Sequence, residues 1–574
     1  MPYSSQTVYR ARILVKSIAA EVKSEHGFSS MAVSIYDTAW LAMIRKESEW
    51  LFPASFTYLL EQQGQDGGWD LLDQSTRATP YPAFLWIPDC IVHSLAGLLA
   101  LCRHARFAAN AGGEKLKTDM LARITRAKSF LDDKLAHFTL DGITHLGFEL
   151  IVPVLLRLLA QEGMHFAFRA KKELLQMYEK ALSADMTWLY DNGPCKVPLF
   201  CLEAFLGKVD FSRLSHLVTS TTGVTASPAS TAAYLIHSGL WSREGEAYLR
   251  HVVSRREDGS VGGLYPLAIF ESCWVLTALL DNGYAAEDLG VGEVDRILQV
   301  VQESLTDGVT GPTHAFFPDA DDTARALMIL SLNDCRTSPV GMIQRFEGDD
   351  FFLTFDDKLP NRVASVSVNG NVLSALLRSP APNLFAAQIE KVARFLCSEW
   401  RRQKTLHDHW NISQYYGIMH MALSLTHLLQ IHSRGKLPSL PADLTTCCIV
   451  PPTLQELLGY LLTRQHLDGA WGELHCCEET AYAIVALAHI GSYSLLIGER
   501  DNDVDKSIAR GKHFILDNWA YNNHTHDRLW TGKILHGSAY IAEAYVLAAL
   551  RVDRVSLGAS NGVVDILDDQ GIYK

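Results

Sequence analysis

Apolar residues recur at helical spacing along most of the chain. Examples are ELIVPVLLRLLAQEG at 149–163, EETAYAIVALAHIG at 478–491 and SAYIAEAYVLAALRV at 538–552. Apolar residues three or four positions apart form one face of a helix, whereas a half-buried strand alternates with a period of two. Runs with a period of two are scarce in this chain. The pattern therefore predicts an all-α fold.

A glycine turn recurs between the predicted helices. It reads QDGGWD at 65–70, EDGSVGG at 257–263 and QHLDGAWGE at 465–473, at spacings of about 200 residues. Such a repeat indicates related helical barrels in which turns of this kind join helix pairs. Asp-Gly alone is a common turn dipeptide, and the middle copy lacks tryptophan. The interpretation therefore depends on the outer copies, which share glutamine and tryptophan as well.

Length and composition are typical of a protein with several folded domains. The 574 residues exceed what one hydrophobic core usually holds, so two or more domains are expected. The chain is 48% hydrophobic, 10% aromatic and 20% charged, as in folded globular proteins. The loop-like stretches at 220–230 and 257–263 are candidate boundaries, and the helical pattern ends after Leu550 in a polar tail.

Charge and cysteine content exclude some functional classes. The net charge of -13 and the pI of about 5.9 argue against nucleic-acid binding, which needs clustered lysine and arginine. The 11 cysteines are an odd number without C-x-x-C spacing, as in reduced intracellular proteins. No secretory signal and no uninterrupted apolar run of ~18 residues is found. We therefore expect no transmembrane segment and a cytoplasmic location.

Three aspartates are crowded at the start of one predicted helix. The stretch FFPDADDTARALMIL at 316–330 places Asp319, Asp321 and Asp322 just before an apolar run. An aspartate at a helix N-terminus caps free backbone N–H groups, and the helix dipole favours its charged form. One interpretation is therefore an ordinary capped helix.

The aromatic residues around the aspartates favour a chemical role. Phe316 and Phe317 precede the cluster, and GDDFFLTF at 348–355 repeats the mixture of acidic and aromatic residues. Burial and mutual repulsion would raise the pKa of at least one carboxyl group and keep it protonated at neutral pH. Such an acid can protonate a poor base. Ionised aspartates could instead hold Mg²⁺ bound to a diphosphate.

The motif Asp-x-Asp-Asp-Thr-Ala at 319–324 resembles the general-acid motif of class II terpene cyclases. Further stretches between about residues 30 and 550 resemble those of the copalyl diphosphate synthase branch of that family, in the same order. Squalene cyclases share the acid motif, so it is the ordered set that makes the resemblance specific. The set comprises SIYDTAWLA (34–42), LGFELIVPVLL (146–156), SPASTAAYL (227–235), YPLAIFESCW (265–274), SVSVNGNVLSAL (365–376), DHWNISQYY (408–416), EETAY (478–482) and LWTGKIL (529–535).

The resemblance implies two α-barrel domains, called beta and gamma, with the active site between them. We expect residues 1–28 to be an N-terminal helix of the beta domain, 29–283 an inserted gamma domain and 284–552 the rest of the beta domain. Residues 553–574 would be a tail or the start of a linker to an alpha domain. In fungal relatives that domain is a class I synthase or a prenyltransferase with Asp-Asp-x-x-Asp motifs, which this sequence does not contain.

The resemblance also implies a reaction. Asp321 would protonate the terminal alkene of geranylgeranyl diphosphate, while Asp319 and Asp322 polarise and position it. Asn369 would bind the other oxygen of Asp321. Ring closure and loss of a proton would give bicyclic copalyl diphosphate with the diphosphate retained, and aromatic faces would stabilise the cations. The aromatic candidates are Phe316, Phe317, Tyr265, Trp274, Trp410, Tyr415, Tyr416 and Trp530.

Other expectations concern the diphosphate, the metal and the last proton transfer. Lys533 is a candidate diphosphate contact, and Asp141 and Glu149 are candidate ligands of Mg²⁺. In plant relatives a histidine and an asparagine hold the water that accepts the final proton. Local alignment places Glu203 and Gly263 at these positions. The plant base is therefore absent, and Glu203 is a candidate substitute.

Several alternatives stay open. A drimane-forming cyclase would use the shorter farnesyl diphosphate, and a squalene-type triterpene cyclase would need more turn repeats and an apolar membrane-inserting stretch. A non-catalytic scaffold usually loses the aspartate motif, which is present here. His409 stands where relatives carry a lysine that contacts the diphosphate. Besides the isoprenoid substrate, the partner arrangements still open are fusion to an alpha domain and a homo-oligomer.

Overall fold

The structure of the protein is a computed structural model in which helices predominate. In the part of the chain that it describes, strands occur only as three two-stranded hairpins. The all-α prediction is confirmed. The structure describes residues 2–554 apart from 73–80, 111–113, 184–185, 191–196, 315, 357–363, 404–405, 407, 446–448, 494–495, 497 and 520–526.

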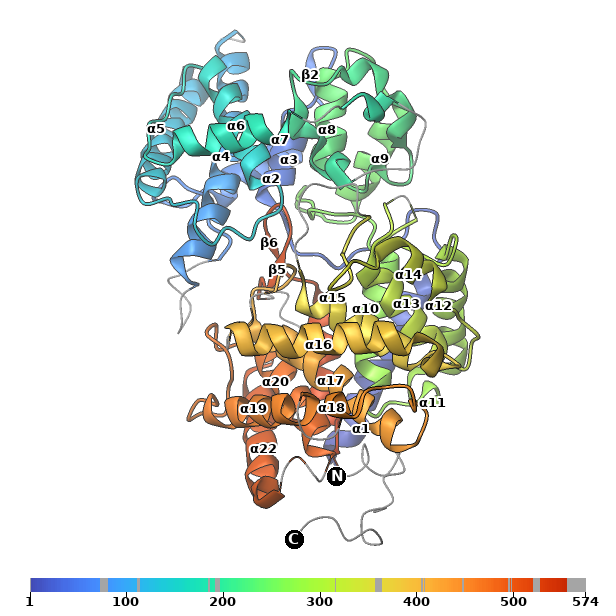
Figure 1. The fold of residues 1–574 in the computed structure, drawn as a ribbon. Helices are drawn as coiled ribbons and strands as arrows, with labels where there is room; N and C mark the ends of the chain where they lie inside the picture. The colour runs from blue at the N-terminus through green and yellow to red at the C-terminus, as the bar shows by residue number, and fades with distance from the viewer. Residues whose placement is uncertain are drawn as a thin grey trace, which may run out of the picture.

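The helices are arranged in two lobes, one above the other in Figure 1. The upper lobe comprises α2 (Ile35–Ala42), α3 (Pro53–Gln62), α4 (Ala83–Asn110), α5 (Glu114–Ala136), α6 (Phe148–Gln161), α7 (Lys171–Ala181), α8 (Pro228–His237) and α9 (Arg243–Ser254), with η1 (Thr187–Tyr190), η2 (Val197–Phe205), η3 (Phe211–Arg213), η4 (Ser215–Leu217) and the hairpins β1 (Arg45–Lys46) with β2 (Glu49–Trp50) and β3 (Val218–Thr219) with β4 (Gly223–Val224).

The lower lobe contains the N-terminal helix and the second half of the chain. It comprises α1 (Pro2–Glu21), α10 (Ala268–Leu280), α11 (Ala286–Leu289), α12 (Val291–Ser304), α13 (Ala320–Leu332), α14 (Val340–Phe346), α15 (Val366–Leu377), η5 (Pro382–Phe385), α16 (Ala386–Gln403), α17 (Gln414–Ser433), α18 (Ala442–Thr445), α19 (Val450–Thr463), α20 (Cys477–Gly491), η6 (Gly498–Arg500), α22 (Asp501–Asn518) and α23 (Ala539–Arg551), with the hairpin β5 (Trp530–Thr531) and β6 (Leu535–His536) before α23.

Each lobe has its own hydrophobic core. Buried apolar residues between Ile35 and Tyr265 form the upper core, which Ile534 of the β5–β6 hairpin also joins. The lower core consists mainly of apolar residues from α1 and from Ala268 to Val552. Helix α1 packs against α12 and α23, so the first and last helices of the chain share one core. The upper lobe is thus inserted between α1 and the rest of the lower lobe.

The expected gamma-domain boundary at 283 is too late. It would assign α10 to the upper lobe, but α10 packs against α13 and α23 in the lower core. The chain has already returned to the lower lobe at Leu267, whose N–H donates to the Phe28 carbonyl oxygen at 2.8 Å. The loop-like composition at 257–263 marks this crossing better.

Backbone hydrogen bonds tie together the segments that pass between the two lobes. The Ser34 N–H donates to the Val261 carbonyl oxygen, and the Ala32 N–H donates to that of Gly537, both at 2.8 Å. The β5–β6 hairpin, which lies between the lobes in Figure 1, accepts a third such bond from the upper lobe. This hairpin brings Lys533 into contact with the upper lobe.

The first and third glycine turns have the same hydrogen bonds. In both, the tryptophan indole N–H donates to a carbonyl oxygen ten residues earlier at 2.8 Å, and a glutamine amide donates to a glycine carbonyl oxygen four residues later at 2.9 Å. One copy lies in each lobe, as expected for related helical units. The residues are Trp69, Leu59, Gln63 and Gly67 in the upper lobe and Trp471, Leu461, Gln465 and Gly469 in the lower lobe.

One helix is long and apolar enough to cross a membrane by length and composition. It is the segment Ala83–Phe107 of α4, and 83% of its apolar 18-residue stretch is buried inside the structure. The segment is not an uninterrupted apolar run, because Pro88, Asp89 and His93 lie within it. Core helices of folded domains have the same composition.

We expect Gly469→Ala to destabilise the protein. Gly469 has φ of +100°, and an added Cβ would lie 2.5 Å from the Arg510 carbonyl oxygen. Strained backbone of this kind costs about 1–3 kcal/mol, so the denaturant midpoint of unfolding should fall. Gly163→Ala is the control, because Gly163 has φ of +81° but nothing within 4 Å of its Cβ position. Equal losses in the two variants would contradict a contribution from the close approach to Arg510.

Candidate active site

The three aspartates lie at the first turn of α13. Asp319 is the N-cap, and its Oδ1 accepts a hydrogen bond from the Asp322 N–H at 2.7 Å. The Asp319 N–H donates to the Thr310 carbonyl oxygen at 3.1 Å, which fixes the entry of the chain into the helix. The capped-helix interpretation is therefore correct for Asp319. Burial raises the pKa of both Asp319 and Asp322, so ionising all three carboxyl groups together is unfavourable.

Asp321 is buried, and its surroundings raise its pKa from 3.8 to about 7. Burial is the main cause, a hydrogen bond from Asn371 opposes it, and repulsion from Asp319 adds to it. The helix N-terminus favours the charged form, but the loss of hydration outweighs that preference. A substantial fraction of Asp321 is therefore a neutral carboxylic acid at neutral pH.

The asparagine that contacts the acid is Asn371, and the assignment to Asn369 is wrong. Asn371 Nδ2 donates to Asp321 Oδ1 at 2.6 Å. Asn369 Nδ2 donates to the carbonyl oxygens of Phe352 at 3.0 Å and Ser365 at 2.9 Å, and its Oδ1 accepts from the Phe352 N–H. Two helical residues rotate a side chain by about 200°. The two asparagines of α15 therefore point to different neighbours.

Four aromatic residues form a row that begins beside the aspartates. The rings of Phe316 and Phe317 have centroids 4.1 Å apart, and Phe355 lies 5.1 Å from Phe317 and 5.8 Å from Trp410. Phe316 also lies 5.8 Å from Phe200 of the upper lobe. The structure therefore brings three of the predicted aromatic residues together and joins them to the other lobe.

A second aromatic group lies in the lower core. Trp274 Nε1 donates to the Tyr416 hydroxyl oxygen at 2.9 Å, and the Trp530 ring lies 5.0 Å from that of Tyr416. Phe270 packs 4.2 Å from Trp274 and 5.6 Å from Trp530. Burial raises the pKa of Tyr416 well above its usual value, so its hydroxyl group stays neutral.

Tyr265 and Tyr415 lie apart from these groups. The Tyr265 hydroxyl donates to the Gly27 carbonyl oxygen at 3.0 Å, and its ring packs in the upper core beside His251. Burial raises the pKa of Tyr415, and repulsion from Tyr460 adds to the shift. Neither tyrosine has a ring contact with the two aromatic groups within the described residues. Their predicted role in stabilising cations is not supported.

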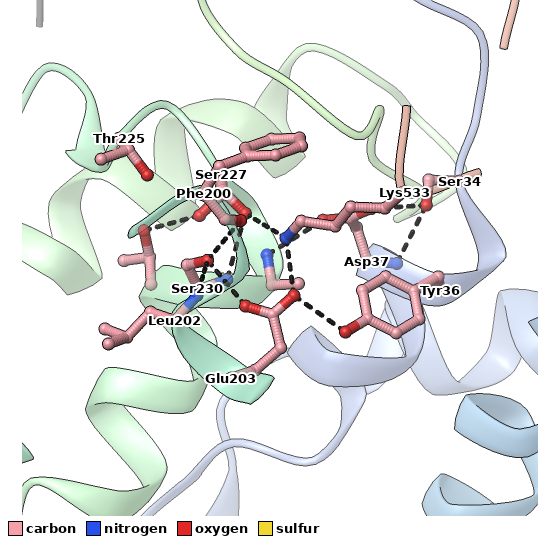
Figure 2. Close-up of polar contacts among 12 residues, drawn as sticks. Ser34, Tyr36, Asp37, Phe200, Leu202, Glu203, Thr225, Ser227, Ser230 and Lys533 are labelled. Carbon is pink, nitrogen blue, oxygen red and sulfur yellow. Dashed lines mark hydrogen bonds and ion pairs between the residues drawn. The ribbon is translucent and has the colours of Figure 1, made fainter. Parts of the chain in front are cut away.

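Lys533 and Glu203, predicted to have separate roles, form one buried ion pair (Figure 2). Lys533 Nζ lies 2.6 Å from Glu203 Oε1 and donates to the Ser227 hydroxyl oxygen at 2.9 Å. Glu203 also accepts from the Tyr36 hydroxyl at 2.8 Å and the Ser230 hydroxyl at 2.7 Å. Lys533 is therefore engaged by the protein, and Glu203 accepts hydrogen bonds from three donors.

A second buried carboxyl group lies beside this pair. Asp37 Oδ2 accepts from the Ser34 hydroxyl at 2.6 Å, as Figure 2 shows. Burial raises the pKa of Asp37 to about 6, against the attraction of Lys533. An added Cβ on Gly263 would lie 3.5 Å from Asp37 Oδ2. The positions of Glu203 and Gly263, which align with the plant histidine and asparagine, are thus part of one polar cluster.

The predicted metal and diphosphate contacts are not assembled. Asp141 is exposed, and Glu149 is half-buried in the first turn of α6. Among the described residues, no three His, Cys, Asp or Glu side chains are grouped so that they could hold a metal ion. Burial raises the pKa of Glu149, which disfavours the ionised ligand, so these residues do not fit a Mg²⁺ site. Burial lowers the pKa of His409, so it does not replace the lysine's charge.

Sequence reasoning missed several residues of the site. Phe355 belongs to the acidic and aromatic stretch at 348–355 and could have been selected from it. Arg325 follows Asp321 by four residues, which places both on one helix face. Asn371 lies in the same motif as Asn369, but only the helix rotation distinguishes them. Phe200 could not be recognised from its sequence neighbours, because it reaches Phe316 only through the packing of the two lobes.

Comparisons with known proteins show relatives over nearly the whole chain. The copalyl diphosphate synthase of Talaromyces verruculosus is 34% identical over 554 residues, covering 94% of this chain and 55% of that protein. The pimaradiene synthase of Emericella nidulans is 36% identical over 555 residues, covering 92% of this chain and 54% of that protein. The chain thus spans about half the length of these curated relatives. A scan against protein-family models gives no match.

Solved structures share the fold. The ent-copalyl diphosphate synthase from Streptomyces platensis aligns with a TM-score of 0.71 at 23% identity, covering 96% of this chain and 100% of that chain. Abietadiene synthase from Abies grandis aligns with a TM-score of 0.58 at 18% identity, covering 95% of this chain and 58% of that chain. At these identities the structures establish the α-barrel fold. Together with the similarity to fungal diterpene synthases, they show that the chain belongs to the class II diterpene cyclase family.

Proposed function

We propose that the chain converts geranylgeranyl diphosphate to copalyl diphosphate, with Asp321 as the general acid. The observation that carries the proposal is a buried carboxyl group with its pKa raised to about 7 and an amide donor at 2.6 Å. Alkenes are very weak bases, so their protonation needs an oriented acid that is neutral before it reacts. The copalyl diphosphate synthase among the relatives supports this choice of product.

The proposed reaction is an isomerisation. The Asp321 proton adds to the terminal alkene, which forms a C–H bond and leaves a carbocation on the neighbouring carbon. The next two double bonds attack in turn and close two rings, and a base then removes a proton to form the final double bond. The faces of Phe316, Phe317 and Trp410, and of the second aromatic group, are suited to stabilise the cations. The diphosphate is retained throughout.

Other expectations stay predictions. They are the need for Mg²⁺, a cytoplasmic location, a homo-oligomer and a further domain. Farnesyl diphosphate is the alternative substrate, because the same acid chemistry applies to a shorter prenyl chain. The assay below therefore includes both substrates and is run with and without a chelator.

Asp321→Asn is expected to lose cyclisation, because the amide has no acidic proton to give. General acid catalysis contributes roughly 10²- to 10⁴-fold, and the loss should reach at least this range. The measurement is product analysis after incubation with each diphosphate and removal of phosphate. In the wild type, activity should fall as the pH rises through about 7, because Asp321 loses its proton there.

Asp349→Asn is the matched control, because Asp349 is an exposed aspartate outside the cluster. It should retain wild-type activity and the wild-type pH profile. A wild-type enzyme that yields only the linear alcohol would contradict the proposed function. Full activity in Asp321→Asn would contradict the assignment of the acid.

Asn371→Leu and Asn369→Leu should have different consequences. Loss of the Asn371 amide removes a hydrogen bond that lowers the pKa of Asp321, so the pH at which activity is lost should move upward. The rate should also fall about 10-fold or more, because an oriented hydrogen-bond donor is lost. Asn369→Leu removes three bonds to Phe352 and Ser365 and should lower the unfolding midpoint without moving the pH profile. Stability and pH–rate measurements on both variants test this. A moved profile in the Asn369 variant alone would overturn the assignment.

Glu203 as the terminal base and Lys533 as a diphosphate contact remain proposals, and their ion pair opposes both. For either residue to take its proposed role, the ion pair between Lys533 and Glu203 must first be weakened. Loss of copalyl diphosphate in Glu203→Gln, in protein that stays folded and still forms hydrated bicyclic products, would favour the base. An unchanged product would exclude it.

Lys533→Met is expected to destabilise the protein strongly. Removing one partner of a buried ion pair costs about 3–5 kcal/mol, because the other charge is left buried without compensation. Replacing both residues, as Glu203→Gln with Lys533→Met, should cost less than the sum of the two single changes. Denaturant unfolding of the four proteins in this cycle measures the coupling. Additive losses would show that the two charges do not stabilise each other.

A further inference from the structure

Arg325 is a buried cation one helical turn after Asp321. Its Nη2 lies 3.2 Å from His420 Nε2 and donates to the Tyr545 hydroxyl oxygen at 3.1 Å. Its guanidinium carbon lies 4.8 Å from the centre of the Trp274 ring. Three helices, α10, α17 and α23, therefore hold the guanidinium group in place beneath the aspartates.

None of these three partners supplies a negative charge. Burial, together with Arg325 itself, lowers the pKa of His420 well below its usual value, so the imidazole is neutral. Burial raises the pKa of Tyr545, so the phenol is neutral as well. In the described part of the chain Arg325 has no salt bridge within 4.0 Å, and its Nε has no hydrogen-bond partner. Such an arrangement is costly for a buried charge.

The charge that Arg325 can balance is that of the aspartate cluster. Residues four apart on a helix are neighbours, and attraction to Arg325 opposes the effect of burial and of Asp319 on the pKa of Asp321. A cavity of about 10 Å³ borders both Arg325 and Asn371. This space is enough for about one water, so solvent screens the guanidinium group little.

Other charged or titratable groups also surround Asp321 and its helix. They come from α13 itself, from α10, from the loop before α17, and from α17 and α23. Of the residues in this set, Arg325 is the one that carries a positive charge. The set comprises Asp319, Asp322, Arg325, Cys273, Asp408, Tyr416, His420 and Tyr545.

We propose that Arg325 is a positioning residue that stabilises the carboxylate formed when Asp321 gives its proton to the alkene. The inference rests on the proposed function of Asp321. Burial keeps the acid protonated before the reaction, but burial alone would also make it a weak acid. A fixed cation with only neutral partners needs no rearrangement when the negative charge forms, which is the condition for electrostatic stabilisation. Arg325 thereby makes a buried acid strong enough to react.

Arg325→Gln tests the proposal, because it removes the charge and keeps a polar side chain. Without the cation the pKa of Asp321 rises, so the pH at which activity is lost should move upward by about one unit or more. The single-turnover rate on the low-pH plateau should fall about 10- to 100-fold, since a weaker acid transfers its proton more slowly. Arg325→Lys keeps the charge and should retain most of the wild-type profile.

Arg378→Gln is the matched control. Arg378 is a largely buried cation of the same lobe, but it is paired with Asp281 at 2.7 Å. This variant should lose stability without moving the pH profile. If Arg325 were purely structural, Arg325→Gln would show the same behaviour. An unmoved or lowered profile in Arg325→Gln would therefore overturn the proposal.

Folding is checked by circular dichroism and thermal melting, and Arg325→Met provides a second neutral variant. If both neutral variants unfold while Arg378→Gln folds, Arg325 is a structural cation and the proposal falls. The wild type is assayed first with geranylgeranyl diphosphate. Absence of cyclised product there refutes the proposed function, whereas an active wild type with an unmoved Arg325→Gln profile refutes only the role of Arg325.

Discussion

A carboxyl group buried at a helix N-terminus is subject to two opposing forces, and the site depends on which of them prevails. The helix end favours a negative charge, whereas loss of hydration favours the neutral acid. Asp319 serves as the cap of α13, so Asp321 need not satisfy the helix end. Asp321 lies in the first turn with one amide donor and is buried. Desolvation therefore prevails, and a common capping arrangement yields a proton donor.

The two lobes meet through aromatic and charged contacts that continue from this donor. The row of rings from Trp410 to Phe316 reaches Phe200 of the upper lobe, and Lys533 lies 4.5 Å from the centre of the Phe200 ring. The ion pair of Lys533 with Glu203 therefore lies at the far end of the same row. A buried pair is costly to separate, so it holds the hairpin against the upper lobe. The lobes are thus joined next to the aromatic row.

Much of the fold was predictable because helical periodicity and turn chemistry are local. The stretches around α6, α20 and α23 and the outer glycine turns all show this. The acid motif was likewise identifiable, since its three aspartates lie within four positions. Asn371 was missed because choosing between two asparagines of one helix requires its rotation about the axis. The Lys533–Glu203 pair joins residues 330 positions apart, and the boundary before α10 depends on which core its apolar residues join. Such choices are made by tertiary packing, which no local pattern records.

The central claim concerns the protonation state of Asp321 in the folded protein. Carbon-13 NMR of aspartate-labelled protein, with Asp321→Asn used to assign the carboxyl signal, measures it without reference to turnover. The account predicts a titration midpoint near the value of about 7. A midpoint close to the ordinary value of 3.8 would show that Asp321 is a carboxylate at neutral pH, and would contradict its role as the proton donor.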